Sequence, residues 1–344
     1  MPSRGRVGWG VVGCGRVAER RFAPAFAACT DATLVAFCSR DLAKARIYAR
    51  RHNALRAYGS LDDLLADAYV QVVYIATPNA LHAPQAIRCL RAGKHVLVDK
   101  PMATSTREAQ EMVAVARETD RTLGVLQQQR FHPGNMHLIR LRDDGQLGKL
   151  NVLRVQIAMW YPPKQSWRGQ PALSGGGVLM DLAPHALDLI LLVGGDITRV
   201  DCQTRTIQFP GEVEDFCSAR LDLAEGAVGL LELSYCAHQY GGRVEAHGSQ
   251  ATLAVEGSMQ SAGTYSTWFR RGQTAEPMQQ TVSTVDCFAA AIENFTDAVQ
   301  QGGEPAISMY DGLRVARLIE AMYASARTER PVEVSGQGSS GRAG

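Results

Sequence analysis

The sequence predicts two domains in series: an N-terminal α/β domain with a doubly wound parallel sheet, and a C-terminal α+β domain with a large, open and mostly antiparallel sheet. Up to residue 126, short apolar runs alternate with helical stretches, which is typical of a parallel sheet covered on both faces. Beyond residue 148, longer segments alternate between apolar and polar residues, as in an antiparallel sheet with one covered face. We expect domains at 1–126 and 127–334, and a disordered tail of linker composition at 335–344.

Five apolar runs, each rich in Val, Leu or Ile, are the expected strands of the first domain: 6–12, 34–38, 70–76, 95–99 and 122–126. Two of the intervening helices have recognisable ends. Asn79 is expected to cap a helix at 80–92 that Gly93 closes, and Thr104 or Ser105 precedes a helix at 108–118. The strand and helix order therefore predicts a doubly wound sheet.

Alternating segments are the expected strands of the second domain: 150–160, 197–209, 217–223, 227–236, 243–247 and 251–256. One helix, at 182–193, interrupts them, and two more, at 288–301 and 311–328, are expected to complete this domain. A sheet of this size leaves one face without a helix over it, and such faces commonly need a partner. We therefore expect a homodimer or homotetramer that forms through this sheet.

Composition narrows the functional classes. The 344 residues include 36 Lys and Arg against 34 Asp and Glu, so the nearly neutral chain gives no reason to expect nucleic acid. The first residues lack an apolar leader and no run approaches the ~18 apolar residues that span a bilayer, so we expect no membrane contact and a cytoplasmic location. Eight scattered cysteines, without C-x-x-C pairs, predict reduced and mostly buried thiols and no metal site.

A glycine-rich motif at the first strand-to-helix junction predicts a dinucleotide site. Two matches to G-x-G-x-x-G/A overlap, at 8–13 and 13–18, and only the second follows a full strand. There Gly13 permits the tight turn, Gly15 lets backbone approach a pyrophosphate, and Ala18 lets helix pack on strand. The amides of the first helical turn would hold the anion. The alternative is a glycine-rich turn without a ligand.

The end of the second strand indicates which cofactor is preferred. Sites for NAD usually carry Asp or Glu there, about 20 residues after the glycines, whereas this chain reads Phe37-Cys38-Ser39-Arg40. Arg40 can pair with a 2′-phosphate to which Ser39 donates a hydrogen bond, with Lys44 nearby. We therefore expect NADP, with NAD possible. The alternative is that Arg40 and Lys44 are solvated surface charges.

Candidate catalytic residues follow the later strands and one helix. Lys100, after a predicted strand, lies at the edge where ligands bind in open α/β sheets. Asp181 and His185 are four residues apart and share a helix face. Pro184 suggests that this helix begins close to Asp181. The alternative is an Asp181 N-cap and a first-turn histidine without a catalytic role.

Several motifs occur in a fixed order along the chain. After the glycine loop come Thr77-Pro78-x-x-x-His82, Asp99-Lys100-Pro101, Arg130-Phe131-x-Pro133, and Gly175-Gly176-Gly177 followed by Asp181-x-x-x-His185-x-x-Asp188. This order resembles the glucose–fructose oxidoreductase, inositol dehydrogenase and MocA (Gfo/Idh/MocA) family over nearly the whole chain. One departure is Asp99, where the family usually has Glu; the shorter acid can still anchor the local backbone.

The resemblance implies that Lys100 lies between nicotinamide and substrate and that Asp181 and His185 face it from the second domain. The residues we expect around the dinucleotide are Gly13, Gly15, Arg16, Val17, Ser39, Arg40, Lys44, Thr77, Pro78, Asn79, His82, Asp99, Lys100, Gln129, Trp167 and Arg168. Those expected around the substrate are Lys100, Arg130, Tyr161, Asp181 and His185. The segment with Trp167 and Arg168 is similar to a loop of ketosugar reductases of this family.

The resemblance implies a nicotinamide-dependent oxidoreductase acting on a sugar, ketosugar or polyol, and Arg40 favours NADP(H) as its cofactor. A histidine can exchange a proton near neutral pH, and a lysine can stabilise a developing oxyanion, so the chemistry of His185 and Lys100 agrees with these roles. Two alternatives remain: an NAD-dependent glycosidase that oxidises its sugar transiently, and a cofactor-sensing regulator without turnover. Intact Lys100, Asp181 and His185 argue against the regulator, and the missing acid near Ser39 argues against the glycosidase.

Overall fold

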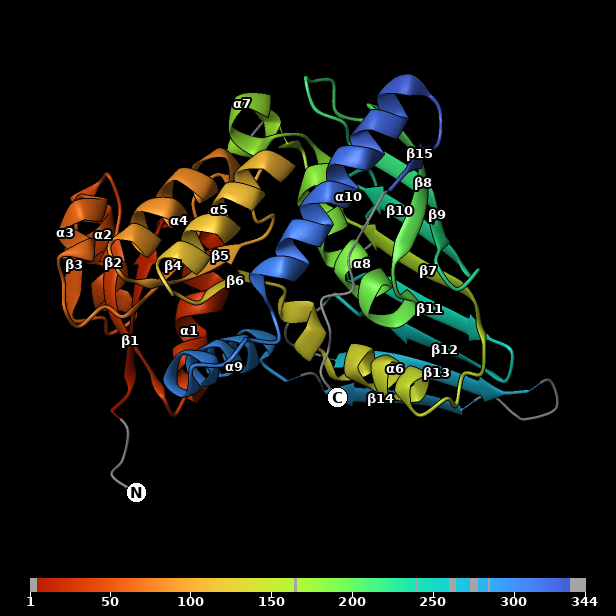
Figure 1. Cartoon of the computed structure of the whole chain (residues 1–344), viewed down its shortest axis with the longest axis horizontal. Coiled ribbons are helices and arrows are strands. Elements are labelled where there is room, and N and C mark those ends of the chain that lie inside the picture. Colours follow the sequence, from red (N-terminus) through yellow and green to blue (C-terminus); the bar gives the residue numbers. More distant parts are fainter. Residues whose placement is uncertain are drawn as a thin grey trace. The chain divides into compact units, whose positions relative to one another are not determined.

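The computed structural model describes residues 5–163, 166–238, 241–259, 264–272, 278–283 and 285–334. By packing, the chain forms two compact units (Figure 1). The first comprises Met1–Gln128 and Asp286–Ala316, and the second comprises Gln129–Val285 and Arg317–Gly344. The predicted tail at 335–344 lies outside the described residues.

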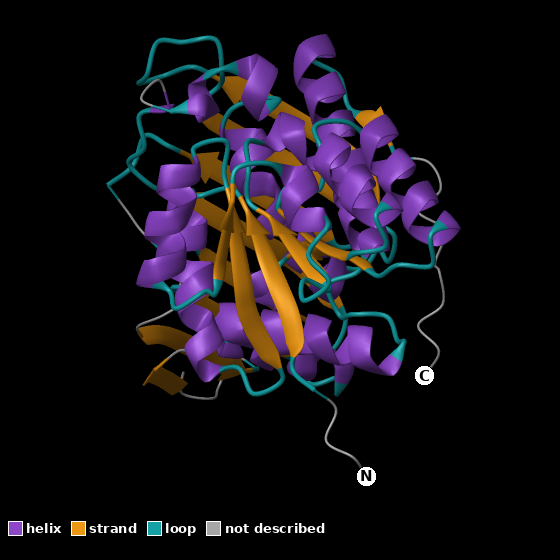
Figure 2. Ribbon diagram, turned by 90° about the vertical axis from the view of Figure 1, so that its left-hand side faces the viewer, coloured by secondary structure: helices purple, strands orange, loops and turns teal. Residues whose placement is uncertain are grey.

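The first unit is built on a six-stranded, wholly parallel sheet with the order β3-β2-β1-β4-β5-β6. Its strands are β1 (Val7–Val12), β2 (Ala32–Cys38), β3 (Arg56–Tyr58), β4 (Val72–Ile75), β5 (His95–Asp99) and β6 (Leu123–Leu126). Figure 2 shows these strands side by side with helices around them. The doubly wound parallel sheet is thus confirmed. Only β3 was not expected, because its three half-buried residues carry no apolar run.

The helices of the first unit are η1 (Ala18–Phe22), α1 (Ala23–Ala25), η2 (Phe26–Ala28), α2 (Leu42–Arg51), α3 (Leu61–Leu65), η3 (Asn79–Leu81), α4 (His82–Arg91) and α5 (Thr106–Glu118). Ser105 caps α5 as expected, because its side chain accepts a hydrogen bond from the Glu108 amide. Asn79 does not cap α4, which is a correction. It begins the short turn η3 instead, and Leu81 is the residue that precedes α4.

The chain returns to the first unit near its C-terminus, through α9 (Cys287–Gln301) and the first part of α10 (Met309–Thr328). The indole of Trp9 in β1 donates to Thr296 Oγ1 at 3.2 Å and packs edge-on against Phe295. Along β6, the amide of Val125 donates to the carbonyl of Ile307 at 3.1 Å. These contacts place 286–316 with the parallel sheet. The sequence predicts instead that this segment belongs to the second domain.

The second unit contains a nine-stranded sheet with the order β14-β13-β12-β11-β7-β10-β9-β8-β15. Its strands are β7 (Leu150–Ala158), β8 (Ile197–Arg205), β9 (Phe216–Leu223), β10 (Val228–Ser234), β11 (Arg243–Gly248), β12 (Ala251–Glu256), β13 (Thr264–Arg271), β14 (Met278–Ser283) and β15 (Val332–Glu333). Strands β7 and β10 pair in parallel, and the other pairs are antiparallel. The large, mostly antiparallel sheet is confirmed.

One face of this sheet is covered by helices, chiefly α8 (Val178–Gly194) and α6 (Pro133–Asp143), with the end of α10 (Figure 1). Shorter helical turns are η4 (Gln128–Phe131), η6 (Trp167–Gly169) and α7 (Pro171–Ser174). The expected start of α8 near Asp181 is wrong: the helix begins at Val178 and Pro184 lies inside it. The amides at the start of α8 bind Glu214, which is distant in the sequence, and the position of Pro184 gives no sign of this contact.

The apolar character of α8 reflects burial in the core. The segment Pro171–Gly194 is long and apolar enough to cross a membrane by length and composition, with a mean hydropathy of 1.6 over its most apolar window, contrary to the expectation from the sequence. In the structure, 83% of that window is buried inside the protein. Helix α8 packs against β7, β9 and β10, so the fold accounts for its hydrophobicity.

The cysteines are free thiols, and seven of the eight are buried, as the sequence predicted. Burial raises the pKa of the Cys89 thiol to about 12, and a protonated thiol packs as a small apolar group.

Candidate active site

The phosphate loop is the second of the two glycine motifs. Gly8 and Gly10 of the first motif lie within β1, where a Cβ would meet Tyr69 and Val70. Gly13 follows β1 with φ +105°, and a Cβ there would lie 2.5 Å from the carbonyl oxygen of Ala76. Only glycine fits this turn, as the sequence predicted.

The residues after Gly13 form the start of a helix. The amide of Glu19 donates to the carbonyl of Gly15 at 3.0 Å, so Arg16 and Val17 supply amides of the first turn. A Cβ on Gly15 would have its nearest neighbour at 3.8 Å, which leaves room for a ligand close to the backbone. Ala18 is fully buried, as close helix–strand packing requires. The loop from Gly13 to Val17 can therefore accommodate a pyrophosphate.

The residues expected to determine the preference for NADP over NAD lie just after β2, up to the first turn of α2. Arg40 and Lys44 are exposed, and Ser39 Oγ accepts a hydrogen bond from the Asp41 amide at 3.2 Å. The carboxylate of Asp41, the residue after Arg40, accepts a hydrogen bond from the Lys44 amide and caps α2. Burial raises the pKa of the Cys14 thiol to about 11, and the Lys44 ammonium opposes this rise.

The loops after β4 and β5 are linked by a buried histidine. His82 Nε2 lies 2.9 Å from the carbonyl oxygen of Thr77, and His82 Nδ1 lies 2.8 Å from that of Pro101. Burial lowers the pKa of His82, while the Asp99 carboxylate and both carbonyls oppose this. Asn79 is also buried. His82 thus holds two loops together, and with 1% of its surface exposed it offers little area to a cofactor.

Lys100 lies on the second of these loops. Its amide donates to Asp99 Oδ1 at 2.9 Å, which gives Asp99 the backbone-anchoring role expected of the shorter acid. The Lys100–Pro101 peptide bond is cis, and Lys100 is half-buried. In the first unit the structure therefore gathers the glycine loop and the loops with Thr77 and Lys100 at the carboxyl ends of the parallel strands.

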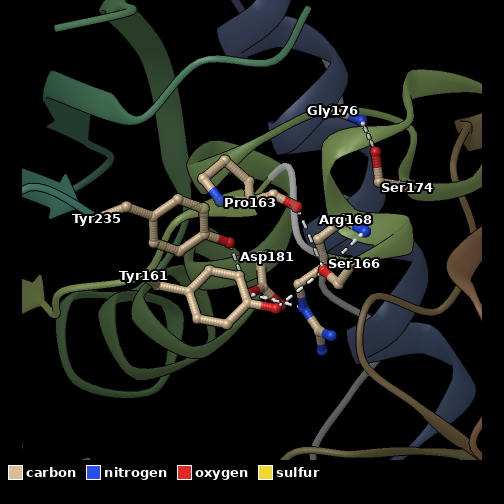
Figure 3. A network of polar contacts seen from close by, with 8 residues as sticks. All are labelled: Tyr161, Pro163, Ser166, Arg168, Ser174, Gly176, Asp181 and Tyr235. Atoms are coloured by element: carbon tan, nitrogen blue, oxygen red, sulfur yellow. Dashed lines mark hydrogen bonds and ion pairs between the residues drawn. The ribbon is translucent and has the colours of Figure 1, made fainter. Parts of the chain in front are cut away.

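Asp181, on α8, is the centre of a polar cluster in the second unit (Figure 3). Its Oδ2 accepts a hydrogen bond from the Tyr235 hydroxyl at 2.7 Å and forms an ion pair with Arg168 Nε at 3.3 Å. The Arg168 guanidinium also lies over the Trp167 ring, 4.4 Å from its centroid. Within this unit Arg168 thus stacks on Trp167 and contacts a residue predicted to be catalytic.

Two tyrosines come to this cluster from the ends of the parallel strands β7 and β10. The Tyr161 amide donates to the Tyr235 carbonyl at 3.0 Å, and their rings lie 5.2 Å apart. The Tyr161 hydroxyl lies 3.0 Å from Ser166 Oγ (Figure 3). Burial and the Asp181 carboxylate hold the pKa of Tyr235 well above its usual value, so its hydroxyl stays protonated and donates.

His185 lies one helical turn after Asp181, and both are partly buried. This spacing puts them on one face of α8. The carboxylate of Asp181, fixed by its phenol and guanidinium partners, therefore shares a helix face with the imidazole of His185. Asp181 is not the N-cap, since Gly177 precedes α8.

Arg130 and Gln129 are engaged elsewhere in the second unit. Arg130 forms a bidentate ion pair with Asp188, in which Nε lies 2.8 Å from Oδ2, and both residues are buried. Gln129 Nε2 donates to the carbonyl of Met259 at 2.9 Å. Both side chains therefore have protein partners, and their predicted contacts with substrate and cofactor stay predictions.

Sequence reasoning missed Tyr235, Ser166 and Glu214. Tyr235 stands at the end of an expected strand, but only the pairing of β7 with β10 brings it to Asp181. Ser166 lies between Tyr161 and Trp167, and in this segment the sequence draws attention only to the larger side chains. Glu214 carried no signal, because its contacts are with main-chain amides far along the chain.

Comparisons with known proteins agree with the fold and the motifs. A family model described as an oxidoreductase family with an NAD-binding Rossmann fold matches residues 7–127, and the GFO/IDH/MocA C-terminal domain matches 136–254. The chain is 26% identical to 1,5-anhydro-D-fructose reductase of Ensifer adhaerens, over 95% of this chain and 98% of that protein. It is 31% identical to Oxidoreductase P35 of Formosa agariphila, over 57% of this chain and 63% of that protein.

Solved structures share the whole architecture. The aldose-aldose oxidoreductase of Caulobacter crescentus, complexed with glycerol, is 28% identical and covers 96% of this chain and 100% of its own, with a TM-score of 0.89. A 3-ketoreductase variant from Actinomadura kijaniata, complexed with TDP-benzene and NADP, is 28% identical and covers 93% and 98%, with a TM-score of 0.84. The chain therefore belongs to the Gfo/Idh/MocA family of oxidoreductases, with an NAD-binding Rossmann fold.

Proposed function

We propose that this protein is an NADP(H)-dependent oxidoreductase that transfers a hydride between the nicotinamide and a sugar, ketosugar or polyol. The observation that carries the proposal is the charged cluster around Asp181, one helical turn from His185, in a chain whose other unit has a phosphate loop. Relatives named as an anhydrofructose reductase and an aldose-aldose oxidoreductase support a carbohydrate substrate.

The chain's own residues supply proton transfer and charge stabilisation. When bound, the nicotinamide supplies or accepts the hydride. In the direction of reduction, the carbonyl carbon gains a hydride, and His185 donates a proton to the oxygen. Lys100 stabilises the negative charge that develops on this oxygen before the proton arrives. Asp181, held by Tyr235 and Arg168, orients the substrate or the imidazole.

The preference for NADP is tested on Arg40. Because a guanidinium pairs strongly with a 2′-phosphate, Arg40→Ala should weaken NADPH binding at least about tenfold, or about 1.4 kcal/mol, and leave NADH binding unchanged. Affinity is measured by quenching of the four tryptophans. Arg46→Ala, which removes an exposed arginine of α2, is the control. Equal losses for both nucleotides, or tighter NADH than NADPH binding by the parent protein, would contradict the NADP preference.

The uncovered face of the nine-stranded sheet supports a homo-oligomer. It forms a shallow hollow of about 800 Å³ lined by basic, acidic and apolar residues, among them Arg154, Arg220, Arg243, Asp201, Glu232, Glu245, Phe216 and Leu230. Charges of both signs lie on neighbouring strands, and Arg154 pairs with Glu245 at 3.6 Å. A surface that carries both signs can complement a second copy of itself. We propose that a second copy of this chain covers it.

Light scattering tests this assembly. The parent chain should be at least dimeric at micromolar concentration, and Leu230→Arg, on the uncovered face, should shift it to monomer because the new charge would be buried in the interface. Leu55→Arg, at a residue of the first unit with 77% of its surface exposed, is the control and should stay oligomeric. A monomeric parent chain would refute the proposal.

A further inference from the structure

Helix α8 begins without a cap from its own sequence. Gly177 precedes it and offers no side chain. The amides of Gly177 and Leu179 donate instead to the Glu214 carboxylate, both at Oε1, at 2.9 and 3.1 Å. Between them, the Val178 amide donates to the Glu214 carbonyl at 2.9 Å. The first amides of the helix that carries Asp181 and His185 are therefore held by a residue from the segment before β9.

The glycine triplet makes room for this contact. A Cβ on Gly177 would lie 2.0 Å from the Glu214 carbonyl oxygen, and one on Gly176 would lie 1.9 Å from the Tyr323 hydroxyl. That hydroxyl donates to Glu214 Oε1 at 2.8 Å, which gives this oxygen a third donor. Gly175 adopts φ +77°, where glycine is favoured. The triplet thus admits an acidic residue and a tyrosine that reach the helix from elsewhere.

The residue after Glu214 fixes the other side of the cluster. The carbonyl of Asp215 accepts the Tyr235 amide at 2.8 Å, and the Tyr235 hydroxyl donates to Asp181. The Asp215 carboxylate in turn accepts three amides, those of Ile207, Gln208 and Phe209, at 2.7 to 2.8 Å. Glu214 therefore holds the start of the helix that carries Asp181. Asp215 holds the backbone of Tyr235, the hydrogen-bond partner of Asp181.

Glu214 stands apart from the reaction chemistry. Its carboxylate contacts two main-chain amides and a tyrosine hydroxyl, all of which are donors that stabilise its charged form. Burial acts against them and raises the pKa of this carboxyl. A carboxylate at a helix N-terminus is also favoured by the helix dipole. The arrangement suits a permanent support of the helix.

We propose that Glu214 is a positioning residue: it caps α8 from outside and so fixes the positions of Asp181, against Tyr235, and of His185 one turn further along the helix. This proposal rests on the proposed function, since it assigns Glu214 a part in the same reaction. It predicts that loss of the carboxylate slows turnover without affecting nucleotide binding, because the glycine loop belongs to the other unit. A small displacement of a catalytic group can cost about a hundredfold in rate.

The test compares Glu214→Ala, Glu214→Gln and Glu212→Ala, the last being an exposed acid two residues away. For Glu214→Ala we expect kcat to fall at least about tenfold with nucleotide affinity unchanged, by the same positional argument. Glu214→Gln should recover most of this loss, since its amide oxygen can still accept the three bonds. Glu212→Ala should match the parent chain.

Hydrogen exchange provides a readout that does not depend on turnover. The amides of Gly177 and Leu179 should exchange faster in Glu214→Ala than in the parent chain and recover protection in Glu214→Gln. Tyr323→Phe, which removes one donor and keeps the carboxylate, gives a milder variant if Glu214→Ala does not fold, and we expect it to lower kcat in the same sense.

The outcomes separate the two proposals. If exchange at these amides is unchanged in Glu214→Ala, or if kcat is unchanged while exchange rises, Glu214 does not position the site. If Glu214→Ala and Glu214→Gln lose the same kcat, the helix-capping bonds are not the cause. If the parent chain turns over no carbohydrate with either nucleotide, the proposed function fails, and the exchange data still show whether Glu214 caps α8.

Discussion

Lys100→Ala is expected to lower kcat by at least about a hundredfold and to leave nucleotide affinity within about twofold. Reduction of a carbonyl builds negative charge on oxygen, and a preorganised cation stabilises that charge most in the transition state. The chain holds the backbone of Lys100 in place through the bond from its amide to Asp99 Oδ1. Removing the ammonium should therefore affect turnover more than binding.

Steady-state kinetics with NADPH and a ketosugar measures this effect. Lys149→Ala, which removes an exposed lysine of the second unit, is the matched control and should retain the parental kcat. Lys100→Arg should recover little, because the planar guanidinium does not reproduce the compact ammonium. Near-parental turnover in Lys100→Ala would contradict the assigned role.

His185→Ala is expected to cause a loss of similar size, at least about a hundredfold in kcat. The reason differs: without the imidazole, the proton for the developing alkoxide must come from water. Added imidazole should therefore restore part of the activity of His185→Ala and none of that of Lys100→Ala. The control is His137→Ala, on α6.

The two variants distinguish proton transfer from charge stabilisation. Because the proton donor is absent in His185→Ala, the dependence of kcat on pH near neutrality should be lost there and kept in Lys100→Ala. A His185→Ala protein that retains both its rate and its pH dependence would assign the proton to another residue, of which Tyr235 is the nearest to Asp181 along the described contacts.

Features that depend on a few consecutive residues could be predicted from the sequence. The apolar runs of the parallel strands and the turn at Gly13 are local, and the structure places both where the sequence indicated. Strands β13 and β14 were not found because their residues are largely polar, so no alternation of apolar side chains marks them.

Features that depend on distant partners could not be predicted. The ion pair of Arg130 is one of them: a buried guanidinium needs a fixed anion, and Asp188 supplies it 58 positions away. The start of α8 was placed too late because its cap, Glu214, lies outside the helix. The segment 286–316 joins the first unit through side chains such as Thr296, whose partner Trp9 is 287 residues away.

Hydride transfer from a nicotinamide to a carbohydrate carbonyl can be followed directly with an isotope label. The protein is incubated with NADPH deuterated at C4 of the nicotinamide and a panel of ketosugars, and the products are examined by mass spectrometry and NMR. We expect one deuterium on the new carbinol carbon for each NADPH oxidised. A glycoside cleaved with the nucleotide conserved, or a nucleotide that binds but is never oxidised by any sugar or polyol, would contradict it.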